Sequence, residues 1–304
     1  MIGCVCLPKI VREFCTNHPS LFLKIVRLAV AAAPPRRFAR RSARAAFFPA
    51  NIAEMLLLVD FFKREGVKFA VLGNMSNVLP ADGMFEGALI FTKRLKSVGI
   101  GQTVFALAGV KAKAFLDSCE RHGKSGAEFL AGIPCTIGGA VFMNAGAGGK
   151  HIEDILESAL VYREGRIRVV PKAECGYSYK QSTFMKDGGV ILGASFCLSD
   201  TDSESVSKER AKYMSARKKL PDGRSMGCVF KNPPDIPAGK LIEGAGLKGL
   251  QVGGAVISEE HANFILNVGG ATSSDVRALV NLIKNAVFSQ YGIALEEEIR
   301  YIDN

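Results

Sequence analysis

The clearest periodicity in the chain lies near its C-terminal end. The apolar positions Val276, Leu279, Val280, Ile283 and Val287 recur at helical spacing. Thr272, with Asp275 three residues later, forms a capping box ahead of them, and Gly292 is placed to end the helix. Residues 293–302 then alternate between apolar and polar, which predicts a strand with Glu298 on its polar face.

Other segments carry the same helical signal. Residues 51–63 have apolar positions every three or four residues, and Gly66 is expected to end that helix. We expect further helices over residues 108–119 and over residues 1–34. The charged run 200–219 alternates in sign, which predicts an exposed helix at the start of a new domain.

Short β-branched and aromatic runs between these segments predict strands. The expected strands cover residues 68–71, 87–90, 159–163, 167–170 and 189–196. Glu164-Gly165 separates two of them and predicts a hairpin turn. Because helices and strands are mixed along the chain, we expect an α+β protein of two or three domains.

Residues 132–149 have a different character. They contain six glycines and no charged residue, so they do not read as an amphipathic helix or as an ordinary exposed loop. Glycine lets backbone approach a ligand closely, and backbone N–H groups can meet anionic oxygens. We interpret this segment as a backbone-built surface for a large, flat, phosphate-bearing ligand. A tightly packed glycine-rich turn in the core is the alternative.

Composition narrows the choice of partner. The chain has 304 residues and a formal net charge of +10, which suggests an anionic partner. There is no recognition-helix pattern, no zinc finger and no interleaved basic and aromatic sheet, so we expect a phosphate-bearing metabolite rather than nucleic acid. Nothing in the sequence indicates an obligate protein partner.

Cysteine usage and the N-terminal apolar run indicate the compartment. The eight cysteines contain no Cys-x-x-Cys pair, which is typical of reduced thiols in a cytosol. With four scattered histidines, no metal site is expected. The apolar run 21–33 is interrupted by Lys24 and Arg27, and it is too short to span a membrane. Its charge order is also wrong for a signal peptide, so we expect a cytoplasmic protein.

Two glycine-rich segments carry a resemblance to a known family. The loop that begins Leu72-Gly73-Asn74 and the segment 132–147 together resemble the flavin-binding half of the UDP-N-acetylenolpyruvoylglucosamine reductase (MurB) family. The resemblance implies FAD contacts from Gly73, Asn74, Ser76, Asn77, Gly132, Ile133, Pro134, Thr136, Gly138, Gly139, Ala140, Asn144, Ala145 and Gly146. Met75 and Cys135 stand where the family pattern has glycine. Arg40 and Arg41 stand where a further glycine pair is expected.

Three more segments resemble the family's catalytic motifs. Residues 227–233 resemble Gly-Ser-x-Phe-x-Asn-Pro, whose serine donates a proton; Cys228 takes that position. A thiol titrates at about 8.5, far closer to neutrality than an alcohol, so it suits proton donation. Residues 179–184 resemble Tyr-Arg-x-Ser-x-Phe, with Lys180 in place of the charge-stabilising arginine.

The third motif and its neighbours complete the implied site. Residues 295–300 resemble Leu-Glu-Pro-Glu-Val-Arg, whose second glutamate is catalytic and corresponds to Glu298. Lys231 and Asn232 are candidates for holding substrate phosphate or sugar. Without the resemblance, Cys228 reads as a buried structural thiol, Lys180 as a surface lysine and Glu298 as part of a solvated strand.

The resemblance implies a two-lobed (PCMH-like) FAD-binding domain followed by a C-terminal α+β substrate-binding domain. The expected divisions are a helical and basic segment over 1–49, FAD-binding lobes over 50–95 and 96–200, and the substrate domain over 201–304. The implied reaction is the NADPH-driven reduction of UDP-N-acetylglucosamine enolpyruvate. Two alternatives stay open: an FAD-linked oxidase with another substrate, and a non-catalytic paralogue that binds a nucleotide sugar.

Overall fold

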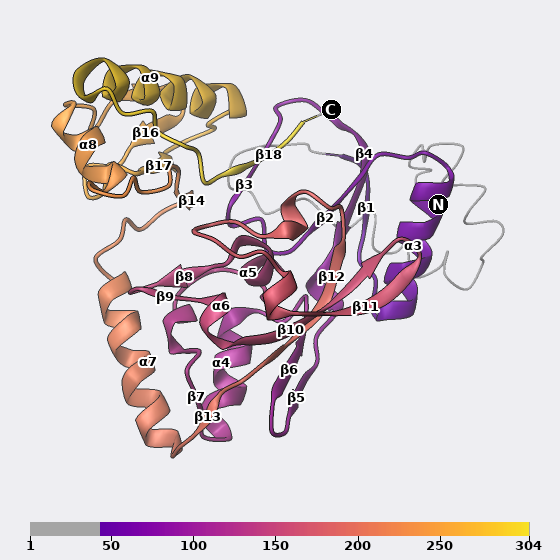
Figure 1. Ribbon diagram of the computed structural model, residues 1–304. Helices are drawn as coiled ribbons and strands as arrows, with labels where there is room; N and C mark the ends of the chain where they lie inside the picture. The colour runs from indigo at the N-terminus through magenta and orange to yellow at the C-terminus, as the bar shows by residue number, and fades with distance from the viewer. Residues whose placement is uncertain (1–42, 304) are drawn as a thin grey trace, which may run out of the picture. The chain divides into compact units, whose positions relative to one another are not determined.

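The computed structural model describes residues 43–303, which divide into two compact units (Figure 1). Unit 1 comprises residues 45–74 and 87–217, and unit 2 comprises residues 43–44, 75–86 and 218–303. The helix predicted over residues 1–34, together with Arg40 and Arg41, lies outside the described residues. Within the described range, no helix is both long and apolar enough to cross a membrane.

Unit 1 opens with a three-stranded sheet and one helix. The sheet contains β1 (Ala43–Phe47), β4 (Phe85–Phe91) and β2 (Phe69–Leu72) in that order, and β2 and β4 run parallel. Helix α3 (Ile52–Arg64) begins after Asn51, whose side chain accepts a 2.9 Å hydrogen bond from the Glu54 N–H. Its buried face, Met55, Leu58, Val59 and Phe62, packs in one core with Phe47 and Ile90. The helix predicted over 51–63 is confirmed.

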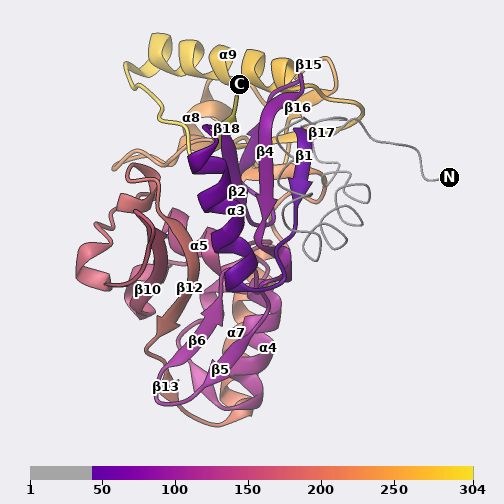
Figure 2. The same ribbon diagram turned by 90° about the vertical axis from the view of Figure 1, so that its right-hand side faces the viewer.

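A five-stranded antiparallel sheet forms the larger part of unit 1 (Figure 2). Its order is β11 (Arg166–Pro171), β10 (Leu156–Arg163), β12 (Val190–Phe196), β6 (Val104–Leu107) and β5 (Val98–Ile100). The predicted hairpin is confirmed, since Glu164 and Gly165 join β10 to β11 with φ angles of 53° and 74°. A type I′ hairpin turn needs positive φ at both central residues.

Two helices share a core with residues of this sheet. Phe115 and Leu116 of α4 (Ala112–Arg121) and Ile137 and Val141 of α5 (Ile137–Met143) lie in one apolar cluster with Phe196. The helix predicted from residue 108 was wrong in its first turn. The N–H of Ala108 donates to Leu192 O and that of Gly109 to Leu95 O, so these residues are held by neighbouring chain rather than by helical bonds.

Short elements connect these layers. They are η1 (Thr92–Arg94), β7 (Lys124–Ser125), η2 (Glu128–Leu130), β8 (Gly146–Ala147), β9 (Lys150–His151), α6 (Ile152–Ile155), η3 (Lys172–Glu174), η4 (Thr183–Met185) and β13 (Ser199–Asp200). The predicted exposed helix is α7 (Ser203–Arg217), which belongs to unit 1 because Arg210 forms 2.7 Å ion pairs with Asp117 and Glu120. The four-segment division of the chain stays a prediction, with α7 on the unit 1 side by its contacts.

Unit 2 is a four-stranded antiparallel sheet with two helices. The strand order is β14 (Ser225–Cys228), β17 (Phe264–Asn267), β16 (Ala255–Ile257) and β15 (Gln251–Val252), and the helices are α8 (Ala238–Gly244) and α9 (Ser273–Tyr291). The buried face of α9 packs with Ile257 and Ile265. The predicted capping box of Thr272 and Asp275 is confirmed, and Gly292 ends α9 with a φ of 68°.

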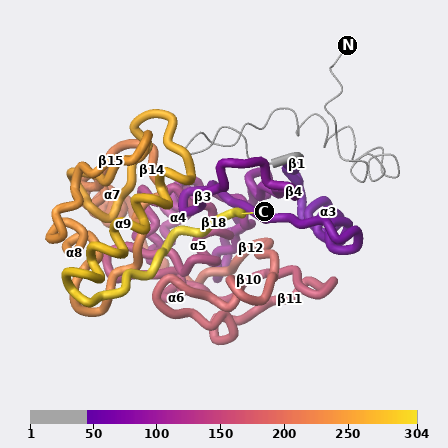
Figure 3. Tube along the Cα trace, turned by 90° about the horizontal axis from the view of Figure 1, so that it is seen from above, coloured from indigo at the N-terminus to yellow at the C-terminus, as the bar shows by residue number. Residues whose placement is uncertain are grey.

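Residues 75–86 join unit 2 although they are distant from it in sequence. β3 (Val78–Pro80) pairs in parallel with β18 (Arg300–Ile302), and the two segments lie side by side in Figure 3. The Asp82 carboxylate accepts hydrogen bonds from the N–H groups of Ser273 and Ser274, at the start of α9. The strand predicted over 293–302 is confirmed only for its last three residues. Residues 293–299 make a single bridge, between Glu297 and Phe230.

Candidate functional site

The glycine-rich segment 132–149 contains a short helix that the sequence did not predict. Thr136 caps α5, and its hydroxyl accepts a 3.4 Å hydrogen bond from the Gly139 N–H. Ile137, Ala140 and Val141 are buried, whereas Gly138 and Gly139 are half-exposed. The exposed side carries glycines and no charged residue, so the sequence showed no contrast between a polar and an apolar face. The exposed side of the helix start is therefore backbone, as the sequence interpretation required.

The loop that begins at Gly73 packs against this helix start. A Cβ at Gly73 would lie 2.2 Å from Thr136 Oγ1, so only glycine fits there. The Asn74 amide donates a 2.7 Å hydrogen bond to Pro134 O, and the Thr92 hydroxyl donates to Leu72 O at 3.3 Å. Two glycine-rich segments about 60 residues apart in sequence thus form one surface within unit 1.

The glycines of this surface divide into two kinds. Cβ atoms at Gly132, Gly138 and Gly146 would meet the chain's own atoms: Arg217 Cδ at 2.7 Å, Ala108 Cβ at 2.8 Å and Lys150 O at 2.2 Å. These glycines are required by internal packing. A Cβ at Gly139 would meet only Thr136 Oγ1, at 3.4 Å. That position presents bare backbone. A flat cofactor such as FAD could approach it closely, because no side chain stands in the way.

The two departures from the family's glycine pattern behave differently. Met75 adopts a φ of 54°, the left-handed region that favours glycine, and its side chain is 6% exposed. Cys135 does not have a positive φ, so nothing in its backbone calls for glycine. Burial raises the pKa of the Cys135 thiol to about 12. It is therefore a protonated, apolar wall residue at neutral pH.

Lys180 lies in a two-residue turn between Ser178 and Gln181, which exchange both backbone hydrogen bonds. Its φ is 57°, again in the region that favours glycine. Non-glycine residues held there cost about 1–3 kcal/mol and cluster at functional sites. Lys180 is half-buried, and its Nζ lies 6.0 Å from the centroid of the Tyr179 ring.

The C-terminal end of α5 holds this turn in place. The Ser182 hydroxyl donates a 2.6 Å hydrogen bond to Phe142 O, and the Tyr177 hydroxyl donates to Val141 O at 3.1 Å. The amide of Asn144, a fully buried residue, donates to Ser178 O at 3.1 Å and to Glu153 Oε1 at 2.8 Å. The last carbonyls of a helix need such partners. The structure thereby connects the glycine-rich segment directly to the lysine turn.

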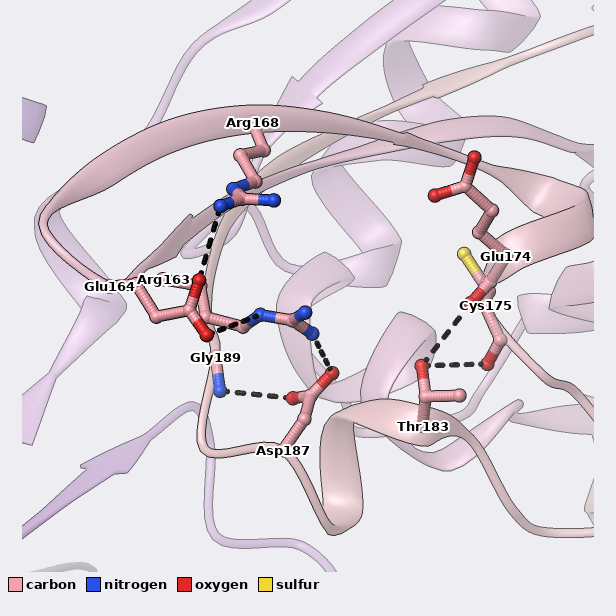
Figure 4. A network of polar contacts seen from close by, with 8 residues as sticks. All are labelled: Arg163, Glu164, Arg168, Glu174, Cys175, Thr183, Asp187 and Gly189. Atoms are coloured by element: carbon pink, nitrogen blue, oxygen red, sulfur yellow. Dashed lines mark hydrogen bonds and ion pairs between the residues drawn. The ribbon is translucent and has the colours of Figure 1, made fainter.

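The flanks of the turn are fixed as well (Figure 4). The Thr183 hydroxyl donates to Cys175 O at 3.2 Å, which closes the chain on one side of the turn. Asp187 forms a 2.7 Å ion pair with Arg163 and accepts from the Gly189 N–H at 3.1 Å, which anchors the other side to the sheet. The backbone around Lys180 is thus held at several points along unit 1.

Cys228 and Glu298 lie on two chain segments that pair within unit 2. The Glu298 N–H donates to Val229 O at 2.8 Å, and the Lys231 N–H donates to Glu296 O at 2.8 Å. Cys228 and Glu298 are both half-buried. The structure therefore brings two of the three predicted catalytic residues into neighbouring positions. Lys180 belongs to unit 1.

Buried amides fix this pair of segments. Asn263, 2% exposed, accepts from the Phe230 N–H at 2.9 Å and donates to Phe230 O at 2.8 Å, as a neighbouring strand would. The Asn77 amide donates to Glu298 O at 3.0 Å, and Asn77 O accepts from the Arg300 N–H. Asn77, expected from the resemblance to contact FAD, thus also positions the predicted catalytic glutamate.

The predicted substrate-binding residues have local partners. Lys231 Nζ lies 2.5 Å from Glu296 Oε1, and Asn232 Oδ1 accepts from the Ala238 N–H at the start of α8. Sequence reasoning missed the supporting residues Asn263, Tyr177 and Ser182. The sequence carried no clear signal for these residues, because their supporting role depends on hydrogen-bond partners that lie elsewhere in the chain.

Comparisons with known proteins agree with this geometry. The FAD binding domain family matches residues 43–170, and the family of the UDP-N-acetylenolpyruvoylglucosamine reductase C-terminal domain matches residues 218–302. UDP-N-acetylenolpyruvoylglucosamine reductase of Caldicellulosiruptor bescii is 40% identical over 86% of this chain and 85% of its own length. The reductase of Carboxydothermus hydrogenoformans is 39% identical over 84% and 86%.

A solved structure points the same way. The crystal structure of UDP-N-acetylenolpyruvylglucosamine reductase (MurB) from Thermus caldophilus superposes with a TM-score of 0.74 at 33% identity, covering 85% of this chain and 92% of that one. The expected fold, an FAD-binding domain joined to a substrate-binding domain, is confirmed. Neither the oxidase nor the non-catalytic alternative is favoured by these matches. The chain therefore belongs to the UDP-N-acetylenolpyruvoylglucosamine reductase family, whose members are FAD-dependent oxidoreductases of peptidoglycan precursor synthesis.

Proposed function

We propose that this chain reduces the enolpyruvyl group of UDP-N-acetylglucosamine enolpyruvate to give UDP-N-acetylmuramate, with NADPH as the reductant. The observation that carries the proposal is the pairing of residues 229–231 with residues 296–298, which brings the segment that follows Cys228 next to the segment that holds Glu298, in a chain 40% identical to such a reductase. A cytoplasmic location is proposed with it. The described cysteines form no disulfide, which supports a reducing compartment.

The cofactor wall supplies binding and orientation. We assign contact with FAD to the backbone at Gly139 and to the loop at Gly73, in line with the resemblance. The chemistry that FAD supplies when bound is hydride transfer from NADPH to the enolpyruvyl double bond. Asn144 has a positioning role in this assignment, because its amide is hydrogen-bonded to Glu153 and Ser178.

Side chains complete the reaction. Addition of hydride to one carbon of the double bond leaves negative charge on the neighbouring carbon and its carboxylate. In line with the resemblance, we assign stabilisation of that charge to Lys180 and to Glu298. The S–H bond of Cys228 then breaks as the new C–H bond forms. The thiolate left on Cys228 recovers its proton from solvent.

Lys231 and Asn232 are assigned to the substrate. An ammonium group and an amide can both meet phosphate or sugar oxygens. In this structure Lys231 is paired with Glu296 and Asn232 caps the start of α8, so binding would exchange or share those partners.

The test is an absorbance spectrum of the purified chain, followed by NADPH oxidation with and without the enolpyruvyl sugar. Cys228→Ala should leave reduction of the flavin by NADPH intact and lower product formation by roughly 10²–10⁴-fold. Cys228→Ser, which restores the family residue, should retain turnover. Cys197→Ala removes an exposed thiol and serves as the control. Unimpaired turnover in Cys228→Ala would remove this residue from the proton-donating role.

A further inference from the structure

Two lysines of unit 1 lie close together at the edge of the glycine-rich surface. Lys93 is in η1, immediately after β4, and Lys111 precedes α4. The chain between β6 and α4 passes directly against η1: a Cβ at Gly109 would lie 1.7 Å from Thr92 O, and the Gly109 N–H donates to Leu95 O at 3.1 Å. This close passage requires glycine, and it brings the two cations together.

No carboxylate of the described chain compensates the pair. Among residues 43–303, neither Lys93 nor Lys111 forms an ion pair, and residues 1–42 contain one acidic side chain, Glu13. Lys93 is half-buried, with its Nζ 5.0 Å from the centroid of the Phe91 ring. Burial, and then the charge of Lys111, lower the pKa of Lys93. Lys111 is exposed, and its charge makes the protonated form of Lys93 less favourable unless an anion binds beside it.

The pair is tied to both segments of the predicted cofactor wall. Thr92, adjacent to Lys93, donates from its hydroxyl to Leu72 O, the residue before Gly73. Lys111 forms a β-bridge with Thr136, the cap of α5, and the next N–H donates to Cys135 O at 3.0 Å. The lysines are therefore attached by short covalent and hydrogen-bonded connections to the loop at Gly73 and to the start of α5.

We propose that Lys93 and Lys111 together bind a phosphate group of a dinucleotide at the edge of the glycine-rich surface. Lysine is a compact point charge that suits phosphate, and the ring of Phe91 holds the Lys93 head in place. The glycine-rich wall alone offers backbone donors and no full positive charge. The inference rests on the proposed function, because it takes the wall to be a dinucleotide site. The phosphate can come from the pyrophosphate of FAD or from the 2′-phosphate of NADPH.

The experiment titrates the flavin-free, full-length chain with FAD and with riboflavin, which lacks phosphate, by flavin fluorescence. Lys93→Gln, Lys111→Gln and the double variant are compared with Lys113→Gln. Lys113 is two residues from Lys111, is exposed and pairs with Asp117, so it makes a matched control. If the pyrophosphate is bound, each substitution weakens FAD binding by about tenfold. Riboflavin binding should not change, and Lys93→Arg should restore much of the FAD affinity.

A second arm identifies the other source. The rate of flavin reduction is measured against NADPH and NADH concentration in the same variants. A loss of apparent affinity for NADPH, with NADH unchanged and FAD binding intact, assigns the lysines to the 2′-phosphate. FAD and NADPH affinities that match those of Lys113→Gln would overturn the inference. Such a result leaves the proposed function standing, whereas a wild-type chain that binds no FAD contradicts both.

Discussion

The turn at Lys180 and the loop at Met75 present the same backbone feature with different surroundings. Both place a non-glycine residue at positive φ, 57° for Lys180 and 54° for Met75. Lys180 is half-buried, and its turn is closed by two backbone hydrogen bonds between Ser178 and Gln181. The Met75 side chain is 6% exposed.

The comparison separates two reasons for tolerating backbone strain. At Met75, burial of a large apolar side chain offsets a left-handed backbone that costs about 1–2 kcal/mol. At Lys180, a half-buried ammonium gains no such burial, so packing does not account for the strain. A residue kept in an unfavourable conformation without a packing gain is a candidate for function. Substitution of each residue by glycine should therefore have opposite effects on stability.

The largest expected effect is on turnover by Lys180→Gly. Loss of the ammonium removes charge stabilisation worth roughly 10²–10³-fold in rate. Stability should rise by about 0.5–1 kcal/mol, because relief of the positive φ exceeds the added flexibility of glycine. Steady-state turnover and chemical denaturation measure the two effects. Lys180→Ala removes the charge and keeps the strain, so it should lose turnover without gaining stability. Equal stability of the two variants would contradict the strain argument.

Met75→Gly should shift stability the other way. It gains the same relief of φ but loses a buried side chain, whose removal costs about 2–5 kcal/mol. The net expectation is a loss of roughly 1.5–4 kcal/mol, read from the denaturation midpoint. A variant as stable as the wild type would show that Met75 contributes little by packing. In that case the comparison with Lys180 would fail.

Gly73→Ala tests the neighbouring position, where glycine is required for space. The new Cβ would lie 2.2 Å from Thr136 Oγ1, which also accepts the Gly139 N–H at the start of α5. Moving that hydroxyl breaks the helix cap, at a cost of about 0.5–2 kcal/mol, and should weaken FAD binding. Gly83→Ala is the control, since nothing lies within 4 Å of its Cβ position. Similar losses of stability and of FAD binding in both variants would show that the contact with the Thr136 cap does not cause them.

Local sequence signals predicted the elements that local forces determine. The end of α3 at Gly66, the capping box of α9 and the Glu164-Gly165 turn depend on residues within a few positions of each other, and all three are confirmed. Other features depend on distant partners. The attachment of α7 to unit 1 needs Arg210 to meet α4, and residues 75–86 enter unit 2 through Asp82 at the start of α9. No pattern near these residues signals such contacts.

The candidate site divides in the same way. The resemblance predicted roles for Cys228 and Glu298, and backbone hydrogen bonds within unit 2 hold the segments that carry them next to each other. The positive φ of Met75 could not be predicted, because methionine gives no signal for that region. The hydrogen bonds of Asn144 and Asn263 could not be predicted either, because the role of an amide is clear only when its burial and partners are known.

The smallest expected effect is on the pH dependence of stability, from substitution of Cys135. This residue contrasts with Met75, because its backbone needs no glycine. Burial raises the pKa of its thiol from 9.0 to about 12, so the folded state keeps the proton longer than the unfolded state does. This contribution is fully present below pH 9 and is lost as the pH rises from 9 towards 12. At one pH unit above the unfolded pKa, the stability lost amounts to about 1.4 kcal/mol.

Cys135→Ala should therefore reduce the fall in unfolding free energy between pH 8 and pH 10 by about 1 kcal/mol, whatever its effect at pH 7. Denaturation midpoints at several pH values measure this slope. Buried Cys119 and Cys175 have thiol pKa values raised to about 12 and about 11, so some alkaline loss remains in the variant. Exposed Cys197→Ala is the control and should keep the wild-type slope. A Cys135→Ala slope equal to that control would show that this thiol reaches solvent, and the wall at α5 would then be more open than its packing indicates.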